Sequence, residues 1–492
     1  MTHQHLLINA VHPEEFRVAI VEGQTLSGFF IETAARGKYV GNIYKGTVVH
    51  VQPSLQAAFV DYGTERNGFL PLPEIHPEYY RKEVEKAARI QDVLEPGQEV
   101  LVQVVKEEIG AKGAALTTYI SLAGRYLVLV PGQQDSRGVS KKIEDEAQRE
   151  RLKEIAHSLK VPEEMGIIVR TAAEQRTKSE LSKDLKYLVL IWKEILKRVA
   201  EAQTPALIYR ERDLAIRVVR DYFNPNIKSV LVDDREVFKK VKEFIHIVSP
   251  KHQYMVKLYK EDAPIFNNYH LEDQIDQLFQ KRVPLKSGGY LIIDATEALV
   301  AIDVNSGRAT RTADQEESSF RVNLEAAAEV PRQLRLRDLG GLIVVDFIDM
   351  RGAQHNREVE RRVKDEVKKD RAKTQVGKIS RFGLLEFSRQ HLGLGIQLAS
   401  YKDCQCCGGT GLVRSTEATA LWYLRKIWNH LLEEKVSGVR ARFAPEVANY
   451  LLNQKRQDIF MLEERFHKSI IIESSAQMQA HEGELEVINA VE

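Results

Sequence analysis

The chain has 492 residues, of which 43% are hydrophobic and 29% charged, and this composition is typical of a globular protein with several domains. A formal net charge of +1 excludes binding to a polyanion through bulk charge, so such binding would depend on local basic patches. All 3 cysteines lie between positions 404 and 407, which excludes a disulfide framework and favours a reducing cytoplasm. Without a basic signal region or an apolar run of roughly 20 residues, we expect a cytoplasmic protein that is not bound to a membrane.

Short strands separated by turn residues are predicted between residues 5 and 31. They are too few to close a domain, and we expect them to join a sheet that is completed later in the chain. From Gly41 onward apolar residues alternate, and Gly63 and Gly68 are placed for tight turns. This segment predicts five short strands with one helical insertion, arranged as a small OB-type barrel. Residues 125–215 combine long helical patterns with apolar strands, which predicts mixed α/β structure.

Aromatic residues fall on the predicted barrel strands at Phe59, Tyr62 and Phe69, and Lys106 and Lys112 follow. Bases stack on aromatic rings while lysines contact phosphates. The sequence therefore predicts that this surface binds single-stranded nucleic acid through Phe59, Phe69, Lys106 and Lys112. The alternative is that both phenylalanines belong to the barrel core.

Two carboxylates lie near the ends of apolar strands, Asp303 in ALVAIDVN and Asp346 in LIVVDFID. Burial of a lone carboxylate costs several kcal/mol unless a cation or dense hydrogen bonding compensates for it. We therefore expect the two strand ends to converge on one magnesium site. Asn305 and Asp349 are close enough in sequence to add ligands or to orient the others. The alternative is that each aspartate pairs with an arginine or caps a turn.

A charge-rich helix is predicted from about Arg357, with Val359, Val363 and Val367 on one apolar stripe. Residues 357–381 hold ten Lys or Arg against five Asp or Glu, which leaves a surplus of five positive charges. We expect the basic faces of this helix to form a phosphate track beside the aspartates. The alternative is an ordinary solvated surface.

The glycine-rich stretch CQCCGGTG, residues 404–411, contains Cys404, Cys406 and Cys407. A tetrahedral zinc site has four ligands, whereas this stretch offers two in a comfortable geometry and three at most. A zinc site here would need further ligands from elsewhere, and a reduced turn without zinc is the alternative. A small α/β segment is predicted after these cysteines.

Several long motifs occur in one order along residues 1 to about 415, and together they closely resemble the ribonuclease E/G family. They are NIYKGTVVHVQPSLQAAFVDYG, GGYLIIDATEALVAIDVNSG, LGGLIVVDFIDM, SRFGLLEFSRQ and CQCCGGTG. Because the family's long disordered tail is absent, the chain resembles a short, ribonuclease G-like member. The resemblance implies an endoribonuclease that cuts single-stranded, AU-rich RNA and leaves a 5′-phosphate and a 3′-hydroxyl. It also implies stimulation by a 5′-monophosphate and a role in ribosomal RNA processing and messenger RNA decay.

The resemblance assigns roles to individual residues. It implies that Asp303 and Asp346 hold magnesium with the support of Asn305, and that RNA is gripped by Phe59, Phe69 and Lys112. It further implies a 5′-monophosphate sensor made of Gly124, Val128, Lys141, Arg170, Thr171 and Lys373. Lys141 and Lys373 stand where the family has arginines, so the positive charge is kept but the bidentate fork that holds phosphate is lost.

The fold that the resemblance implies is multidomain α/β. Its parts are a ribonuclease H-like subdomain (1–35 with 216–279), an OB-type RNA-binding barrel (36–124), a 5′-sensor (125–215), a deoxyribonuclease I-like catalytic subdomain (280–400), a zinc-link (401–415) and a small α/β C-terminal domain (416–492). The barrel and the sensor are then inserted in the ribonuclease H-like subdomain.

In the family, two chains share one zinc ion through this cysteine turn. The resemblance therefore implies zinc ligands at Cys404 and Cys407 of each of two chains, and a homodimer or higher homo-oligomer. Three glycines would let the backbone fold tightly around the metal, namely Gly408, Gly409 and Gly411. Cys406 is then a bystander or a redox-sensitive spare.

Two other functions are compatible with parts of the pattern. A non-catalytic RNA-binding factor for ribosome assembly would need only the barrel and the basic helix, but an acidic pair that repels phosphate argues against it. A zinc hydrolase at the cysteines would lack a general base, and thiolate turns of this kind are usually structural.

Overall fold

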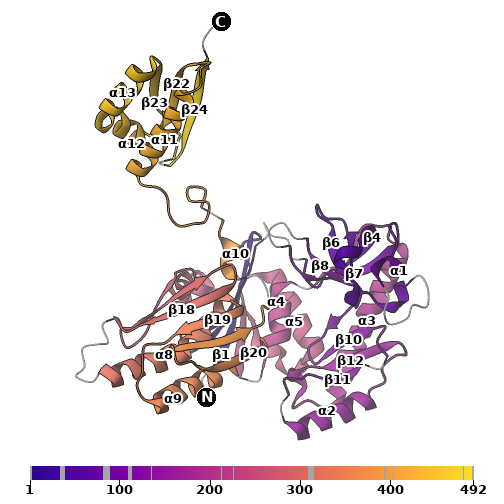
Figure 1. Ribbon diagram of the computed structural model, residues 1–492. Coiled ribbons are helices and arrows are strands. Elements are labelled where there is room, and N and C mark those ends of the chain that lie inside the picture. The colour runs from indigo at the N-terminus through magenta and orange to yellow at the C-terminus, as the bar shows by residue number, and fades with distance from the viewer. Residues whose placement is uncertain are drawn as a thin grey trace. The chain divides into compact units, whose positions relative to one another are not determined.

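The computed structural model describes residues 3–33, 39–80, 89–108, 113–134, 136–143, 145–211, 213–224, 226–307, 315–392, 395–402, 404–479 and 481–489. The chain forms two compact units, Met1–Ser400 and Tyr401–Glu492, which are described separately (Figure 1). Within the described ranges, a helix with both the length and the apolar surface needed to span a bilayer is not found.

The N-terminal strands complete a five-stranded sheet with two strands from much later in the chain, as predicted. The strands are β1 (Gln4–Asn9), β2 (Glu15–Glu22), β3 (Thr25–Thr33), β14 (Ile227–Val232) and β15 (Val256–Leu258), in the order β15-β14-β1-β2-β3. β1 is antiparallel to β2 and parallel to β14. One face of the sheet packs against α4 (Leu214–Tyr222) and α5 (Arg235–Val248), and the other against α6 (Ile265–Asn268) and α7 (Glu272–Gln277).

Five strands close the predicted OB-type barrel, in the order β4-β5-β6-β8-β7, with β7 returning to pair with β4. They are β4 (Ile43–Gln52), β5 (Ala57–Asp61), β6 (Gly68–Pro71), β7 (Glu99–Lys106) and β8 (Ala115–Thr117). The short helix α1 (Ile90–Val93) falls in the predicted helical insertion. β13 (Ala206–Tyr209) pairs with β4, so this strand belongs to the barrel sheet although it lies within residues 125–215.

A four-stranded sheet with two helices follows the barrel in the chain. The strands are β9 (Leu122–Ala123), β10 (Leu127–Pro131), β11 (Arg137–Val139) and β12 (Met165–Val169), in the order β11-β12-β10-β9, and the helices are α2 (Glu146–Ser158) and α3 (Lys178–Glu201). α3 begins at a capping box, in which Thr177 and Glu180 each satisfy the backbone N–H of the other. Leu181, Leu185 and Leu188 on α3 join the apolar core of this sheet.

The last sheet of the first unit has six strands in the order β16-β17-β18-β19-β21-β20. They are β16 (Arg282–Pro284), β17 (Tyr290–Ala295), β18 (Leu299–Asn305), β19 (Gly341–Asp346), β20 (Thr374–Ile379) and β21 (Leu384–Arg389). α8 (Gln315–Arg337) and α9 (Ala353–Val367) cover one face, where Ile302 and Val345 share a core with Val322 and Val363. Because side chains alternate along a strand, the neighbours of Ile302 and Val345 point to the opposite, open face. α10 (Ile396–Ser400) ends the unit.

The second unit is a small α/β domain, as predicted. Its strands β22 (Val436–Phe443), β23 (Ser469–Ser474) and β24 (Gly483–Asn489) have β22 at the centre, and its helices are α11 (Thr416–Leu431), α12 (Pro445–Asn449) and α13 (Arg456–Phe466). Ile427 on α11 and Leu462 on α13 pack with Val439 of the central strand. The cysteine turn precedes α11 in the chain.

Candidate active site and nucleic-acid interface

The two aspartates lie at the ends of neighbouring parallel strands. Asp303 on β18 pairs in register with Asp346 on β19, and side chains paired in this way lie on one face of a sheet. Their neighbours Ile302 and Val345 are buried on the helix-covered face, and both aspartates are exposed on the open face. The two carboxylates therefore come together as expected. The expectation that they are buried is wrong, because the alternation of the strands turns them away from the core.

Among the residues that the structure describes, the carboxylate pair has a polar neighbour but no lysine or arginine partner. Asn305 Nδ2 donates a 2.7 Å hydrogen bond to Asp303 Oδ2. Burial, together with the negative charges of Asp303 and Asp349, raises the pKa of Asp346. Neither Asp303 nor Asp346 forms an ion pair with a lysine or arginine that the structure describes, so the arginine-pairing alternative finds no support. A hard cation such as Mg²⁺ relieves the repulsion of like charges in such an arrangement.

The donor set fits a magnesium ion held by few protein ligands. Across the described part of the chain, no group of three or more His, Cys, Asp or Glu side chains is arranged to hold a metal by itself. Mg²⁺ usually binds one or two carboxylates and completes its shell with waters or phosphate oxygens. Two exposed carboxylates on an open sheet face meet that requirement, and they leave room for a phosphate.

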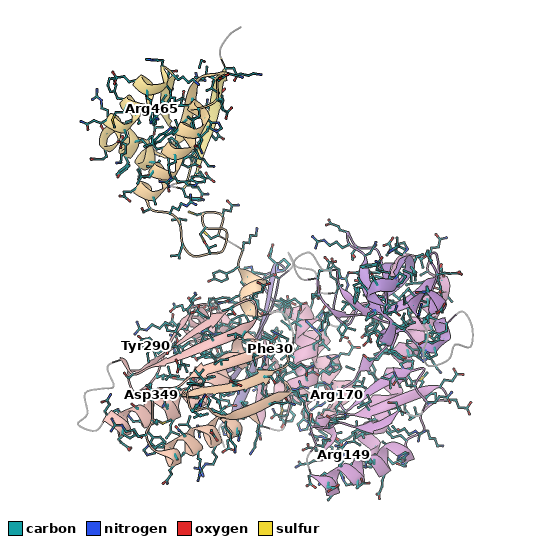
Figure 2. The ribbon with its side chains drawn as sticks, in the orientation of Figure 1. Phe30, Arg149, Arg170, Tyr290, Asp349 and Arg465 are labelled. Carbon is teal, nitrogen blue, oxygen red and sulfur yellow. The ribbon has the colours of Figure 1, made fainter. Side chains whose placement is uncertain are left out.

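The loop after β19, which carries Asp349 (Figure 2), is fixed by contacts with α8. The fully buried Asn323 side chain donates to Ile348 O at 2.8 Å and accepts from Ile348 N at 3.1 Å. Glu316 accepts a 3.1 Å hydrogen bond from the backbone N–H of Arg351. Asn323 was not predicted from the sequence, because its role depends on a contact between distant positions. Asn323 is one of several polar residues on the buried side of α8, so its residue type alone does not distinguish it.

The basic helix α9 lies on the face of the sheet opposite the carboxylates. Its stripe of Val359, Val363 and Val367 is buried in the core, as predicted. That core lies behind Asp303 and Asp346, so the expectation of a phosphate track beside the aspartates is wrong for α9. Its charges form local ion pairs, namely Arg361–Glu358, Arg362–Glu366, Lys368–Asp365 and Lys369–Glu366.

The barrel phenylalanines belong to a row of side chains that crosses all five strands. His50 pairs with Phe59, Phe59 with Phe69, Phe69 with Ala115 and Ala115 with Lys106. The rings of Phe59 and Phe69 meet edge to face with centroids 5.9 Å apart, and His50 stacks on Phe59 at 6.5 Å. Both phenylalanines are half-buried and neither is part of the barrel core. The row therefore forms an aromatic surface strip with an exposed lysine at one end.

For three further barrel residues, the structure and the sequence-based prediction compare in different ways. Tyr62 is 1% exposed and belongs to the core. Lys112 lies outside the described residues. His50 was not singled out from the sequence, although an aromatic ring in an alternating strand next to Phe59 was the available signal.

Four residues of the predicted sensor lie around the turn between β9 and β10 and the end of β12: Gly124, Val128, Arg170 and Thr171. Arg170 donates from Nη1 to Gly124 O, and from Nη2 to Asp221 Oδ1 at 2.7 Å. A Cβ at Gly124 would lie 2.5 Å from Asp184 Oδ2, so the close approach of α3 requires glycine here. Arg170 and Asp349 lie in different parts of the first unit (Figure 2), so the residues of the predicted sensor are separate from the carboxylate pair.

Lys141 and Lys373 are both exposed, and neither forms an ion pair with a described carboxylate. The segment before Lys373 reaches the sensor through Arg371, whose Nη1 lies 3.8 Å from Asp221 Oδ2. Burial, together with the positive charge of Arg371, lowers the pKa of Lys142. Positive charge from two distant segments therefore lies together at Lys142 and Arg371, and Arg371 adjoins Asp221, a residue that the sequence did not single out.

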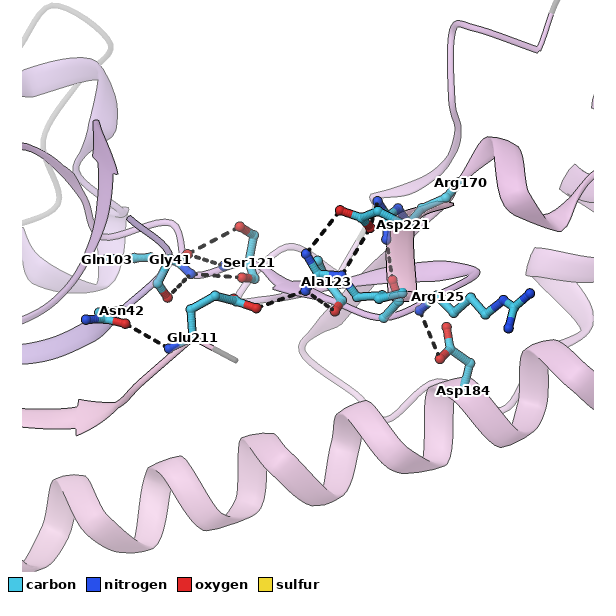
Figure 3. A network of polar contacts seen from close by, with 12 residues as sticks. Gly41, Asn42, Gln103, Ser121, Ala123, Arg125, Arg170, Asp184, Glu211 and Asp221 are labelled. Carbon is cyan, nitrogen blue, oxygen red and sulfur yellow. Dashed lines mark hydrogen bonds and ion pairs between the residues drawn. The ribbon is translucent and has the colours of Figure 1, made fainter. Parts of the chain in front are cut away.

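A polar network links the barrel, the sensor sheet and α4 (Figure 3). Asn42 Oδ1 in the barrel accepts from Glu211 N at 2.8 Å, and Glu211 Oε1 accepts from Arg220 Nη1 at 2.9 Å. Arg220 also donates to Ala123 O at 3.2 Å, and its Nε donates to Asp221 at 3.1 Å. The charged groups that hold these parts together are thus the same groups that surround the sensor arginine.

The cysteine turn has the backbone that its glycines predict. Gly408, Gly409 and Gly411 all have positive φ, between 57° and 87°. The pKa of Cys407 is lowered, chiefly by the backbone N–H of Gly411 and also by the Cys404 thiol, which favours the thiolate that metals bind. Cys406 Sγ lies 3.8 Å from His481 Nδ1.

Comparisons with known proteins agree with this arrangement. The Ribonuclease E/G family profile matches residues 121–392, the S1 RNA binding domain matches residues 39–118, and the RNase E/G, Thioredoxin-like domain matches residues 403–488. Over 478 residues (97% of the chain, 51% of the relative), the chain is 48% identical to Ribonuclease E of Haemophilus influenzae. It is 47% identical to Ribonuclease E of Escherichia coli K12 over 94% of the chain and 44% of that relative.

A shorter relative is covered more completely. The chain is 40% identical to Ribonuclease G of Escherichia coli K12 over 86% of the chain and 87% of that relative. The chain therefore spans about half the length of the two ribonucleases E and most of the ribonuclease G. The identity of the chain to the two ribonucleases E is higher than its identity to this ribonuclease G.

Proposed function

Because this chain belongs to the ribonuclease E/G family, we propose that it is a magnesium-dependent endoribonuclease of the cytoplasm. It cleaves single-stranded, AU-rich RNA to 5′-phosphate and 3′-hydroxyl ends. Its substrates are ribosomal RNA precursors and messenger RNA. The observation that carries the proposal is the in-register pairing of Asp303 with Asp346 on an open sheet face, without a cationic partner among the described residues.

This geometry supports the following catalytic roles. Asp303 and Asp346 would hold the metal ion, and the hydrogen bond from Asn305 fixes the orientation of the Asp303 carboxylate. Bound magnesium supplies stabilisation of the charge that develops on the phosphoryl oxygens and activation of an in-line water. Asp349 adds negative charge beside Asp346 and so favours a cation at this place.

The barrel holds the RNA strand. Bases stack on the row formed by Phe59 and Phe69, and Lys106 contacts a phosphate at the end of the row. Lys112 is assigned the same role from the family resemblance. Stacking on aromatic faces is tolerant of base identity, which suits an enzyme with broad single-stranded substrates.

The 5′-monophosphate sensor is the second RNA contact. Arg170 and Thr171 grip the terminal phosphate beside the backbone of Gly124 and Val128, and Lys141 and Lys373 add positive charge. Support comes from the exposure of both lysines and from the contact of Arg371 with Asp221 at the same place. Lysine replaces the bidentate arginine fork by point charges, so we expect a preference for the 5′-monophosphate that depends on salt.

Two chains share one zinc ion through the cysteine turn. Cys404 and Cys407 supply two thiolates, and a second copy supplies the other two, which completes a tetrahedral site. The lowered pKa of Cys407 and the tight glycine backbone support this assignment. The position of Cys406 beside His481 supports its role as a bystander.

We also propose subdomain names, which come from the family resemblance. The five-stranded sheet with β1, β2 and β3 antiparallel and β14 and β15 parallel is the ribonuclease H-like subdomain. The barrel and the sensor are inserted between its two halves. The six-stranded sheet that carries the aspartates is the deoxyribonuclease I-like catalytic subdomain.

Cleavage of a 5′-labelled single-stranded RNA tests the proposal. Three matched RNAs, with 5′-monophosphate, 5′-hydroxyl and 5′-triphosphate ends, are incubated with the wild-type chain and with Asp303→Asn, each with Mg²⁺ and with EDTA. We expect internal cleavage only by the wild-type chain with Mg²⁺, fastest for the 5′-monophosphate. RNA binding without cleavage under every condition would overturn the proposal in favour of a non-catalytic RNA-binding factor.

A further inference from the structure

We propose that Asp221 sets the 5′-end specificity of the sensor, by holding Arg170 in place and by repelling ends that carry more negative charge than one phosphate. The proposal rests on the function proposed above, in which Arg170 receives the terminal phosphate. Asp221 is a positioning and specificity-determining residue in this scheme. It does not touch the scissile bond.

Asp221 is bound to Arg170 more closely than to any other described arginine. Arg170 Nη2 lies 2.7 Å from Asp221 Oδ1, and the other arm of the same guanidinium, Nη1, is held by Gly124 O (Figure 3). Arg170 comes from the end of β12 and Asp221 from α4, so two separate elements fix one side chain. An arginine held at two donors loses little further freedom when it binds a ligand.

The guanidinium of Arg170 keeps donors for a phosphate. A guanidinium has five N–H groups, and the two contacts above occupy one on each terminal nitrogen. The second N–H of each terminal nitrogen and the Nε–H remain. Asp221 therefore does not have to be displaced when a terminal phosphate binds, and its carboxylate stays close to the bound phosphate.

The charge of the site is limited by its own carboxylates. Asp221 contacts Arg170 and Arg220 and lies 3.8 Å from Arg371, and Glu211 pairs with Arg220 at 2.9 Å. These three guanidinium groups and two carboxylates together carry a net charge of +1, to which Lys141 and Lys373 of the proposed sensor add positive charge. Although burial acts in the opposite direction, the three arginines lower the pKa of Asp221 to about 2, so its charge is present at neutral pH.

The negative charge of Asp221 affects the binding of different RNA ends to different degrees. A terminal monophosphate carries a charge of about −1.5 to −2 at neutral pH. A triphosphate carries more, so repulsion by a fixed carboxylate costs the triphosphate more binding energy than it costs the monophosphate. Without the charge of Asp221, the site would bind the 5′-monophosphate and the 5′-triphosphate end alike, and the preference for the monophosphate would fall.

The test is the ratio of kcat/KM for 5′-monophosphate RNA to that for 5′-triphosphate RNA, each measured relative to the same RNA with a 5′-hydroxyl. Asp221→Asn keeps an oxygen that accepts from Arg170 but removes the charge. We expect the ratio to fall about five- to tenfold in Asp221→Asn, through KM for the triphosphate RNA, at low salt. Asp221→Ala also releases Arg170, and we expect it to lose the stimulation by the monophosphate as well.

Glu211→Gln is the matched control, because it removes one negative charge from the same network without touching Arg170. We expect its ratio to stay within about twofold of wild type, since the Glu211 carboxylate pairs with Arg220 and its charge is therefore farther than that of Asp221 from a phosphate bound at Arg170. An unchanged ratio in Asp221→Asn, or an equal fall for all three RNA ends, would overturn this proposal while the sensor itself stands. A wild-type chain that does not distinguish the three ends would overturn the sensor assignment and this proposal together.

Discussion

Asp303 lies directly opposite Asp346 across the parallel ladder of β18 and β19, on the face that α8 and α9 leave open. A hydrogen bond from Asn305 fixes one oxygen of Asp303. No described lysine or arginine neutralises either carboxylate, so the pair retains its charge for a metal ion. The same ladder that brings the two carboxylates together keeps them exposed, which a phosphodiester substrate requires.

Asn in place of Asp303 or Asp346 removes one charge from the pair and keeps its shape. We expect either change to lower the cleavage rate on the order of a hundredfold or more, because stabilisation of the phosphoryl oxygens is lost, with little effect on RNA binding. Gel assays give the rate and filter binding gives the affinity. Asp294→Asn is the control, since Asp294 is partly exposed on the adjacent strand β17 and forms an ion pair with Lys281. A rate near wild type for Asp303→Asn would refute the assignment.

The aromatic row on the barrel leads to a second prediction. Phe59→Ala or Phe69→Ala is expected to weaken single-stranded RNA binding by about 1–3 kcal/mol each, because one stacking surface is lost. Lys106→Ala should reduce the salt dependence of binding, because one phosphate contact is lost. Fluorescence anisotropy with a short RNA at several salt concentrations measures both effects. Leu55→Ala, an exposed apolar residue of the same barrel outside the row, should bind as wild type.

The local sequence pattern was sufficient to place those candidate residues whose position depends on the alternation of side chains along a strand. It placed Phe59 and Phe69 on barrel strands, and it brought Asp303 and Asp346 to neighbouring strand ends. The same alternation was misread for burial, because an apolar strand with one open face looks like a strand that is buried on both faces. The side of the sheet on which α9 packs was also not encoded locally, since a helix with one apolar stripe fits either face.

Contacts between segments that are distant in the chain could not be predicted from the local sequence pattern. Asp221 and Arg170 lie 51 positions apart, and Asn323 and Ile348 lie 25 positions apart. Each of these polar residues has an unremarkable sequence environment, and its partner is set by how separate elements pack. Such pairs are found only when the fold is known, although the family resemblance had already pointed to Arg170.

Asn323 supports the metal site indirectly, through the loop that joins Asp346 to Asp349. Its buried amide makes two hydrogen bonds to Ile348, and Asn323→Ala leaves both backbone groups without their partner. We expect a stability loss of about 1–3 kcal/mol and a higher magnesium concentration for half-maximal cleavage, with partial recovery of the rate at high Mg²⁺. Thermal unfolding and a magnesium titration of the rate measure these. Lower stability with an unchanged magnesium midpoint would mean that Asn323 is purely structural.

The three cysteines are expected to differ in their effect on zinc. Cys404→Ser and Cys407→Ser should each lose zinc and shift the assembly toward the monomer, because a shared tetrahedral site then lacks two of its four thiolates. Cys406→Ser is the matched control and should retain about one zinc per two chains, since Cys406 lies beside His481. Metal analysis and analytical ultracentrifugation measure the two properties. An assembly that persists after complete removal of zinc by a chelator would favour a zinc-free turn.

The charge of Asp221 makes a contribution to stability that depends on pH. Its pKa is lowered from 3.8 to about 2 in the folded chain, which corresponds to about 2 kcal/mol. A lowered folded-state pKa stabilises above the unfolded value, so the contribution is complete at pH 7 and is lost as the pH falls from about 5 toward 2. We therefore expect Asp221→Asn to lower the free energy of unfolding by about 2 kcal/mol at pH 7 and by clearly less at pH 3, as measured by denaturant titration at both values. The control is Asp213→Asn, because among the described residues the Asp213 side chain forms an exposed ion pair with Lys240 alone, and asparagine serves equally well at the start of α4. If Asp221→Asn were as stable as wild type at pH 7, the carboxylate would not be held by the arginines around it.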